Sequence, residues 1–213
     1  MWSLIILLFL FILVVYLYYP NSRCTVLQRI PYRDGVTIEV VEDECSEGLP
    51  HTVGSNTIRM PVGAYNNSRK AQTLFHEMVH IAQRRNLQAW YDFYEREWGY
   101  TKYTGERRFD IRPNPDTADH PLMLWRNRFI FVPEYGSNRT LRGAQTRVWD
   151  TELNKYVNKP QEWIEFFESS GPVHQSEHPH EIAAELLTHR PDCPAFRLLL
   201  GFTPFNLGGK EWL

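Results

Sequence analysis

Two histidines flank a glutamate at four-residue spacing in the run Phe75–His80, which reads FHEMVH. On a helix, residues i and i+4 lie one above the other, so His76 and His80 can direct two imidazoles at one ion. Zinc binds nitrogen ligands at about 2.0–2.1 Å and keeps an open position for water in catalytic sites. Glu77 follows the first histidine and could take a proton from a zinc-bound water. The spacing therefore predicts a hydrolytic zinc site.

The residues around this motif predict a buried helix from roughly Arg69 to Asn86, because apolar residues occur on most of its sides. The alternative is a pair of hydrogen-bonded core histidines without metal. Burying two imidazoles and a carboxylate on one helix without a partner is costly, since each must be desolvated. Zinc is therefore the favoured interpretation.

A third ligand must come from elsewhere in the chain. The extended pattern with a glycine and a third histidine is absent, since those positions hold Gln83 and Asn86. A later run, HPHEIAAELLTH, places Glu181 and Glu185 four residues apart on one face of a second expected helix. Two inward carboxylates need a cation or a donor. One glutamate would bind zinc, and the other would orient a ligand histidine.

Three histidines compete with these glutamates, because His174, His178 and His180 all lie close before Glu181 or next to it. A histidine from this group could bind zinc or stabilise the transition state. They could equally be surface residues near the start of a helix. Tyr135, Tyr156 and His174 are the candidates for a second oxyanion donor, and the sequence does not choose between them.

HEMVH followed by EIAAE resembles the gluzincin metallopeptidases, in which a glutamate on a downstream helix is the third zinc ligand. EIAAELL is similar to that helix in lethal-factor-type toxins and small gluzincins. HTVGSNTIRM is similar to the edge strand that precedes the active helix and pairs with substrate. The resemblance implies that His76, His80 and Glu181 bind zinc, that Glu77 is the general base and that Glu185 orients a ligand. Many members have Asp at the position of Glu185.

The expected fold is α+β: a zincin-like (gluzincin) domain over residues 21–213 with a central helix, a sheet with an edge strand and a second ligand helix. His51–Gly63 is expected to form one extended strand, and Pro61 places it at a sheet edge. The aromatic stretch Ala89–Ser170 could line a substrate cleft, although a core role is the more common one.

Residues 1–20 are expected to be a transmembrane anchor. From Trp2 to Tyr19 there is no charged residue, and eighteen helical residues span about 27 Å. A cleaved signal peptide is disfavoured, because no Lys or Arg precedes the apolar run and tyrosines end it. A short chain with a bare anchor would also suit a viral protein.

Two features of the sequence give opposite indications of the side of the membrane on which the domain lies. Arg23, Arg29 and Arg33 follow the anchor, which favours a cytoplasmic domain. The sequons that begin at Asn66 and Asn138 would matter only on the lumenal side. Of the three cysteines one pair could form a disulfide, but the sequence does not demand it.

The net charge of −2 gives no indication of a nucleic-acid partner. The expected function is a membrane-anchored zinc metallopeptidase that hydrolyses peptide bonds by Glu77-assisted attack of a zinc-bound water. Its partners would be a peptide or protein substrate and the membrane. The alternative is a non-catalytic, zinc-containing binding or structural protein, tethered to the membrane and built on the same scaffold.

Overall fold

The computed structural model describes residues 24–106, 109, 114–134, 144–169 and 171–189. The expected anchor over residues 1–20 lies outside these ranges, as do Tyr135, Asn138 and Cys193. Within the described ranges, no helix combines the length and the apolar character that a membrane crossing requires.

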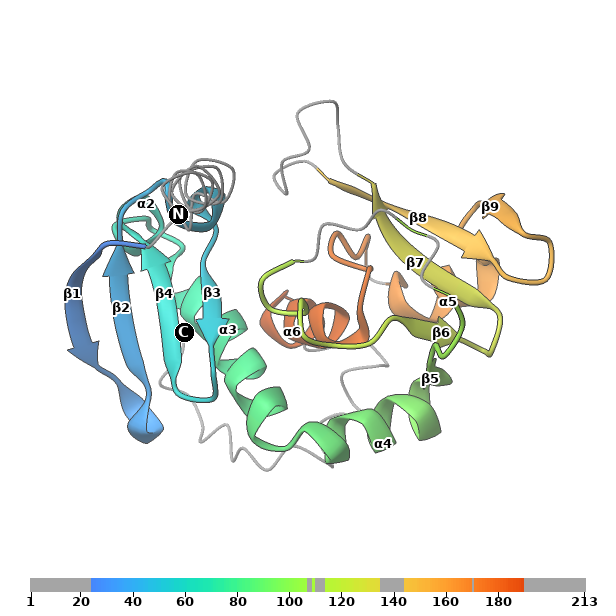
Figure 1. Ribbon diagram of the computed structural model, residues 1–213, viewed down its shortest axis with the longest axis horizontal. Helices are drawn as coiled ribbons and strands as arrows, with labels where there is room; N and C mark the ends of the chain where they lie inside the picture. Colours follow the sequence, from blue (N-terminus) through green and yellow to red (C-terminus); the bar gives the residue numbers. More distant parts are fainter. Residues whose placement is uncertain (1–23, 107–108, 110–113, 135–143, 170, 190–213) are drawn as a thin grey trace, which may run out of the picture.

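A four-stranded sheet forms the first half of the fold, with strand order β1-β2-β4-β3 (Figure 1). The central pair β2 and β4 is parallel, whereas β1–β2 and β3–β4 are antiparallel. A short 3-10 turn, η1 (Arg33–Gly35), joins β1 to β2, and a second one, η2 (Cys45–Gly48), precedes β3. The strands are β1 (Val26–Pro31), β2 (Thr37–Val41), β3 (His51–Val53) and β4 (Thr57–Pro61).

The expectation of one extended strand over residues 51–63 is wrong. Two antiparallel strands occupy this segment, with a turn over residues 54–56 between them. Gly54 adopts a φ of +61°, which glycine accepts at no steric cost. Strand β3 lies at the sheet edge, whereas β4 is internal and Pro61 is its last residue. The proline therefore ends a strand instead of marking an edge.

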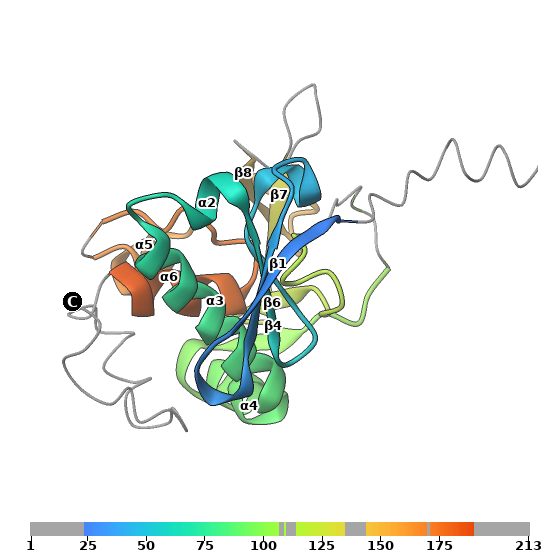
Figure 2. The ribbon, with the colours of Figure 1, turned by 90° about the vertical axis from the view of Figure 1, so that its left-hand side faces the viewer.

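Helix α3 (Lys70–Arg85) follows the short helix α2 (Val62–Tyr65) and covers one face of this sheet (Figures 1 and 2). Leu74, Met78 and Ile81 pack into a core with the sheet residues. Val79 and Ala82 enter a second, larger core. The helix is thus buried on two sides, which confirms the prediction of a central helix with apolar residues around most of its circumference.

The second half is a five-stranded antiparallel sheet with order β5-β6-β7-β8-β9, and α4 (Leu87–Trp98) leads into it from α3. Helix α6 lies between the two sheets and contacts α3 (Figure 1). Most tryptophans of the aromatic stretch are buried here, which confirms its role as core. The remaining elements are β5 (Tyr100–Lys102), β6 (Met123–Trp125), β7 (Phe129–Glu134), β8 (Gln145–Asp150), β9 (Lys155–Val157), α5 (Gln161–Phe167) and α6 (Pro179–His189).

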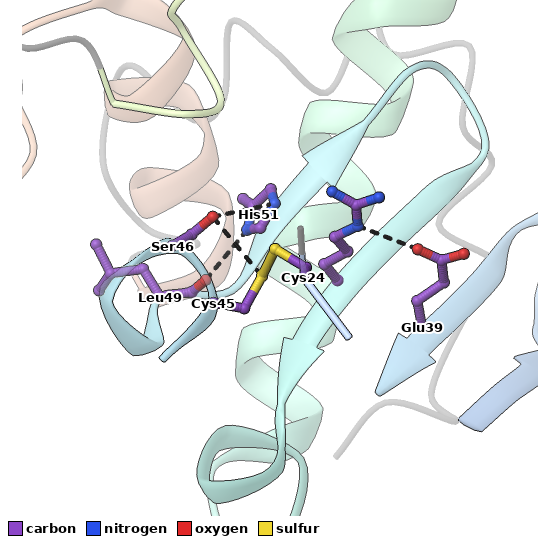
Figure 3. Close-up of a disulfide and its surroundings, with 7 residues drawn as sticks. Cys24, Glu39, Cys45, Ser46, Leu49 and His51 are labelled. Carbon is purple, nitrogen blue, oxygen red and sulfur yellow. Dashed lines mark hydrogen bonds and ion pairs between the residues drawn. A yellow bond between two sulfur atoms is a disulfide. The ribbon is translucent and has the colours of Figure 1, made fainter. Parts of the chain in front are cut away.

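A disulfide joins Cys24 to Cys45 and ties the start of β1 to the η2 turn (Figure 3). The ring of His51 in β3 contacts this turn and the residue after it. Its Nε2 lies 3.4 Å from Ser46 Oγ, and its Nδ1 lies 3.2 Å from the Leu49 carbonyl oxygen. The disulfide therefore braces the loop that leads into the edge strand. The sequence alone left this pairing open.

Candidate metal centre

Two helices far apart in the sequence bring three ligand-type side chains together. Helix α3 carries His76 and His80, and α6 carries Glu181 in its first turn. The two histidine Nε2 atoms lie 3.1 Å apart. Glu181 Oε2 lies 3.4 Å from Nε2 of His76 and 3.3 Å from Nε2 of His80. In the described part of the chain, this is the only group of three or more such residues that could hold a metal ion.

The triangle of donor atoms fits a zinc ion. Three ligands at about 2.0–2.1 Å in a tetrahedral arrangement lie about 3.3–3.4 Å from one another, close to the observed spacings. Glu181 Oε2 is buried and, among the described residues, has no hydrogen-bond partner beyond its approach to the two histidine Nε2 atoms, as an oxygen that faces an ion would be. Two imidazoles and a carboxylate are also a common catalytic zinc set, which leaves a fourth position open.

The three donor side chains differ in their exposure to solvent. The side chains of His80 and Glu181 are each 1% exposed, whereas that of His76 is 18% exposed. Among the three donors, His76 is therefore the side chain that solvent reaches.

Gln83 fixes the orientation of His80. Its amide nitrogen donates to Tyr94 Oη at 3.1 Å and to the His180 carbonyl at 2.9 Å. Its oxygen must therefore face His80 Nδ1, which lies 2.8 Å away. An N–H at Nδ1 donates to this oxygen and directs Nε2 toward His76 and Glu181, where a metal ion could bind. Gln83, which replaces the glycine of the longer histidine motif, thus orients a candidate ligand, a role that the sequence interpretation missed.

Asn114 holds the other oxygen of Glu181. Its amide nitrogen donates to Glu181 Oε1 at 3.0 Å and lies 3.5 Å from Glu177 Oε1. The backbone N–H of Asp116 donates to the Asn114 oxygen at 3.0 Å, which sets the direction of the amide. Glu181 therefore presents Oε2 to the histidines because Oε1 is occupied. Nothing local in the sequence indicated a contact between Asn114 and α6.

The Asn114 turn is itself anchored to the first sheet and to α3. Asp116 Oδ1 accepts the backbone N–H and the hydroxyl of Thr52, both at 2.7 Å. Arg84 donates to Thr52 Oγ1, to the Asp116 carbonyl and to Asp119. Strand β3, helix α3 and Glu181 are thus joined through one short segment.

Glu77 is buried on α3 next to the ligand-type His76, and its Oε2 has no hydrogen-bond partner among the residues that the structure describes. Burial raises the pKa of Glu77 well above its usual value, and the charges of Asp116 and Glu181 raise it further, against the opposing effect of His80. A bound cation would add positive charge and lower this pKa again. The residue has the buried, tunable carboxyl group that a general base requires.

Glu185 lies one turn after Glu181 and is buried. Both of its oxygens accept the backbone N–H of His174 at 3.0 Å, and Oε2 also accepts that of Gln175 at 2.9 Å. These bonds hold the segment that enters α6. The proposed action of Glu185 on a ligand histidine stays a prediction.

The rival histidines occupy other positions. His174 is exposed. The rings of His178 and His180 are buried and contact each other and His120, and His180 Nδ1 lies 3.0 Å from Tyr94 Oη. Burial lowers the pKa of His178 to about 3, so its ring is neutral. Neither ring belongs to the group that could hold a metal, which leaves Glu181 as the third ligand of that group.

The candidates for a second oxyanion donor remain unassigned. Tyr156 lies in β9, where its ring packs against Trp149 and under the guanidinium of Arg147. Searches against protein-family models, curated proteins and solved structures find no match for this chain. The function must therefore be inferred from the geometry of the centre.

Proposed function

We propose that this chain is a zinc-dependent metallopeptidase. The observation that carries the proposal is the convergence of His76, His80 and Glu181 Oε2 at 3.1–3.4 Å, with the buried carboxyl group of Glu77 on the same helix. Structural zinc sites usually close all four positions with protein ligands. Three ligands, one open side and a spare carboxylate favour catalysis over the non-catalytic alternative.

Each side chain has a distinct task in this proposal. Zinc bound to the three ligands would supply Lewis acidity to a water molecule and to the scissile carbonyl. Glu77 takes a proton from the attacking water and passes it to the leaving amine. Gln83 and Asn114 keep the ligand atoms in place, and the exposed side of His76 admits the substrate.

Zinc content and peptide cleavage test the proposal together. The full chain, purified in detergent and loaded with one equivalent of zinc, is incubated with a proteome-derived peptide library, and new termini are identified by mass spectrometry. Glu77→Gln keeps the size of the side chain but removes the base, so we expect zinc to be retained and cleavage to be lost. Glu152→Gln, at an exposed carboxylate beyond β8, is the matched control and should cleave normally.

Three results are decisive. Cleavage by wild type and Glu152→Gln but not by Glu77→Gln supports the peptidase. Stoichiometric zinc without cleavage in any protein favours the non-catalytic zinc protein. A folded protein that binds no zinc at micromolar concentration refutes the metal centre itself.

A further inference from the structure

Asn66 begins the sequon Asn66-Asn67-Ser68 in the turn between α2 and α3, and all three residues are exposed. The structure gives no hydrogen bond to the Asn66 side-chain amide among the described residues. Asn67 Oδ1 instead accepts the Arg69 backbone N–H at 2.8 Å, which shapes the turn. Asn66 is therefore presented as a free amide on a surface turn, as N-glycosylation requires.

The disulfide supplies an independent indication of the compartment. Cys24 and Cys45 are bonded, and Cys45 is only 3% exposed. Structural disulfides form and persist in oxidising compartments and are rare in the cytosol. In forming the bond, two thiols lose two protons and two electrons to a thiol oxidant of that compartment. The secretory pathway holds both this oxidant and the machinery for N-glycosylation.

We infer that Asn66 is an N-glycosylation site and that the folded domain resides on the lumenal or extracellular side. The donor class is a lipid-diphosphate-linked oligosaccharide. Asn66 Nδ2 forms a bond to the anomeric carbon of the sugar while the bond from that carbon to the diphosphate breaks. The amide loses one proton, and the lipid diphosphate leaves.

This inference opposes the cytoplasmic side that Arg23, Arg29 and Arg33 favour. A disulfide between the start of β1 and η2 is a property of the folded domain, whereas the arginine pattern is a statistical tendency of flanking segments. The inference does not depend on zinc or on peptidase activity, and its test uses neither.

The test is translation of the full chain with endoplasmic-reticulum microsomes. Ser68→Ala removes the sequon without changing Asn66, and Ser68→Thr preserves it, so the two form a matched pair. Both are made in an Asn138→Gln background, which removes the second sequon. We expect a mobility shift reversed by peptide-N-glycosidase in the background protein and in Ser68→Thr, and no shift in Ser68→Ala.

Thiol tagging with a maleimide polymer provides the second measurement. We expect Cys24 and Cys45 to be tagged only after reduction, whereas both are tagged without reduction if the domain is cytosolic. A glycan shift that depends on Ser68 supports the proposal. An oxidised pair without a Ser68-dependent shift overturns the assignment of Asn66. Free thiols without a shift overturn both the site and the compartment.

Discussion

Replacing Asn114 by Ala should weaken zinc binding without unfolding the protein. The substitution removes the donor that lies 3.0 Å from Glu181 Oε1 and frees the carboxylate to rotate. A hydrogen bond to a charged group contributes roughly 1.5–3 kcal/mol. Because about 1.4 kcal/mol corresponds to a tenfold change in affinity, we expect zinc to bind roughly 10–100-fold more weakly. Losses of this size are typical when a partner of a metal ligand is removed.

Competition with a chromophoric zinc chelator measures the affinity, and thermal unfolding of the metal-free proteins reports the fold. Gln88→Ala is the control, because its amide donates to Asp92 on the exposed surface of α4, away from the candidate metal centre. Thr52→Val should have a smaller effect than Asn114→Ala, since the Thr52 backbone N–H still anchors Asp116. Wild-type zinc affinity in a folded Asn114→Ala protein would refute the reasoning.

Further predictions concern the contact of Gln83 with His80, the disulfide, and the release of protons when zinc binds. Gln83→Ala should also weaken zinc binding roughly 10–100-fold, whereas Gln83→Glu, which keeps an acceptor for His80 Nδ1, should restore part of it in the same chelator assay. Replacing Cys24 and Cys45 by Ser, which opens a loop of 21 residues, should cost about 3 kcal/mol. The unfolding temperature should then fall by roughly 6–12 °C in calorimetry, and an unchanged value would show that the bond does not constrain the fold. Burial alone would lower the pKa of His80, but the charges of Glu181 and Asp116 raise it to about 10, so the ring is protonated at pH 7.5 in the metal-free protein. Zinc binding should then release at least one proton and weaken as the pH falls, and calorimetry in buffers of different ionisation enthalpy that finds no release contradicts this. Because the pKa of His80 is raised in the folded state, its protonation stabilises the metal-free fold. This contribution is fully present below about pH 6.5 and is lost as the pH rises toward 10.

The parts of the centre that lie on one helix were predictable from the sequence. The spacing of His76 and His80 requires a shared helix face, and the apolar residues around them require burial of that helix. The start of α6 at Pro179 was also predictable from local sequence, because proline suits the first turn of a helix. The convergence of α3 and α6 is a long-range property. It was indicated by the two carboxylates on one face of the second helix and by the resemblance of EIAAE to a known ligand helix.

The remaining parts left weaker signals or none. Gln83 lies three residues after His80, on the same helix face, so its contact with the histidine could have been anticipated. Asn114 donates to Glu181, which lies 67 positions later in the chain. Asn114 lies in an irregular turn, which has no periodic sequence pattern that could have predicted this contact. The β3–β4 hairpin was missed because the β-branched residues on either side of Gly54 masked the turn residues between them.

The turn that contains Asn114 and Asp116 limits how a substrate of the proposed peptidase can approach the candidate metal centre. Thr52 of the edge strand directs its backbone N–H away from β4 and donates it to Asp116 Oδ1. A peptide that paired with β3 at this amide would have to displace Asp116, whose backbone N–H holds Asn114 against Glu181. Strand pairing at Thr52 would therefore loosen the third ligand. A substrate that enters beside His76 avoids this conflict, because that side chain is the exposed member of the donor triangle. For the proposed peptidase, the geometry thus favours entry from the His76 side, with the Thr52–Asp116 contact kept intact.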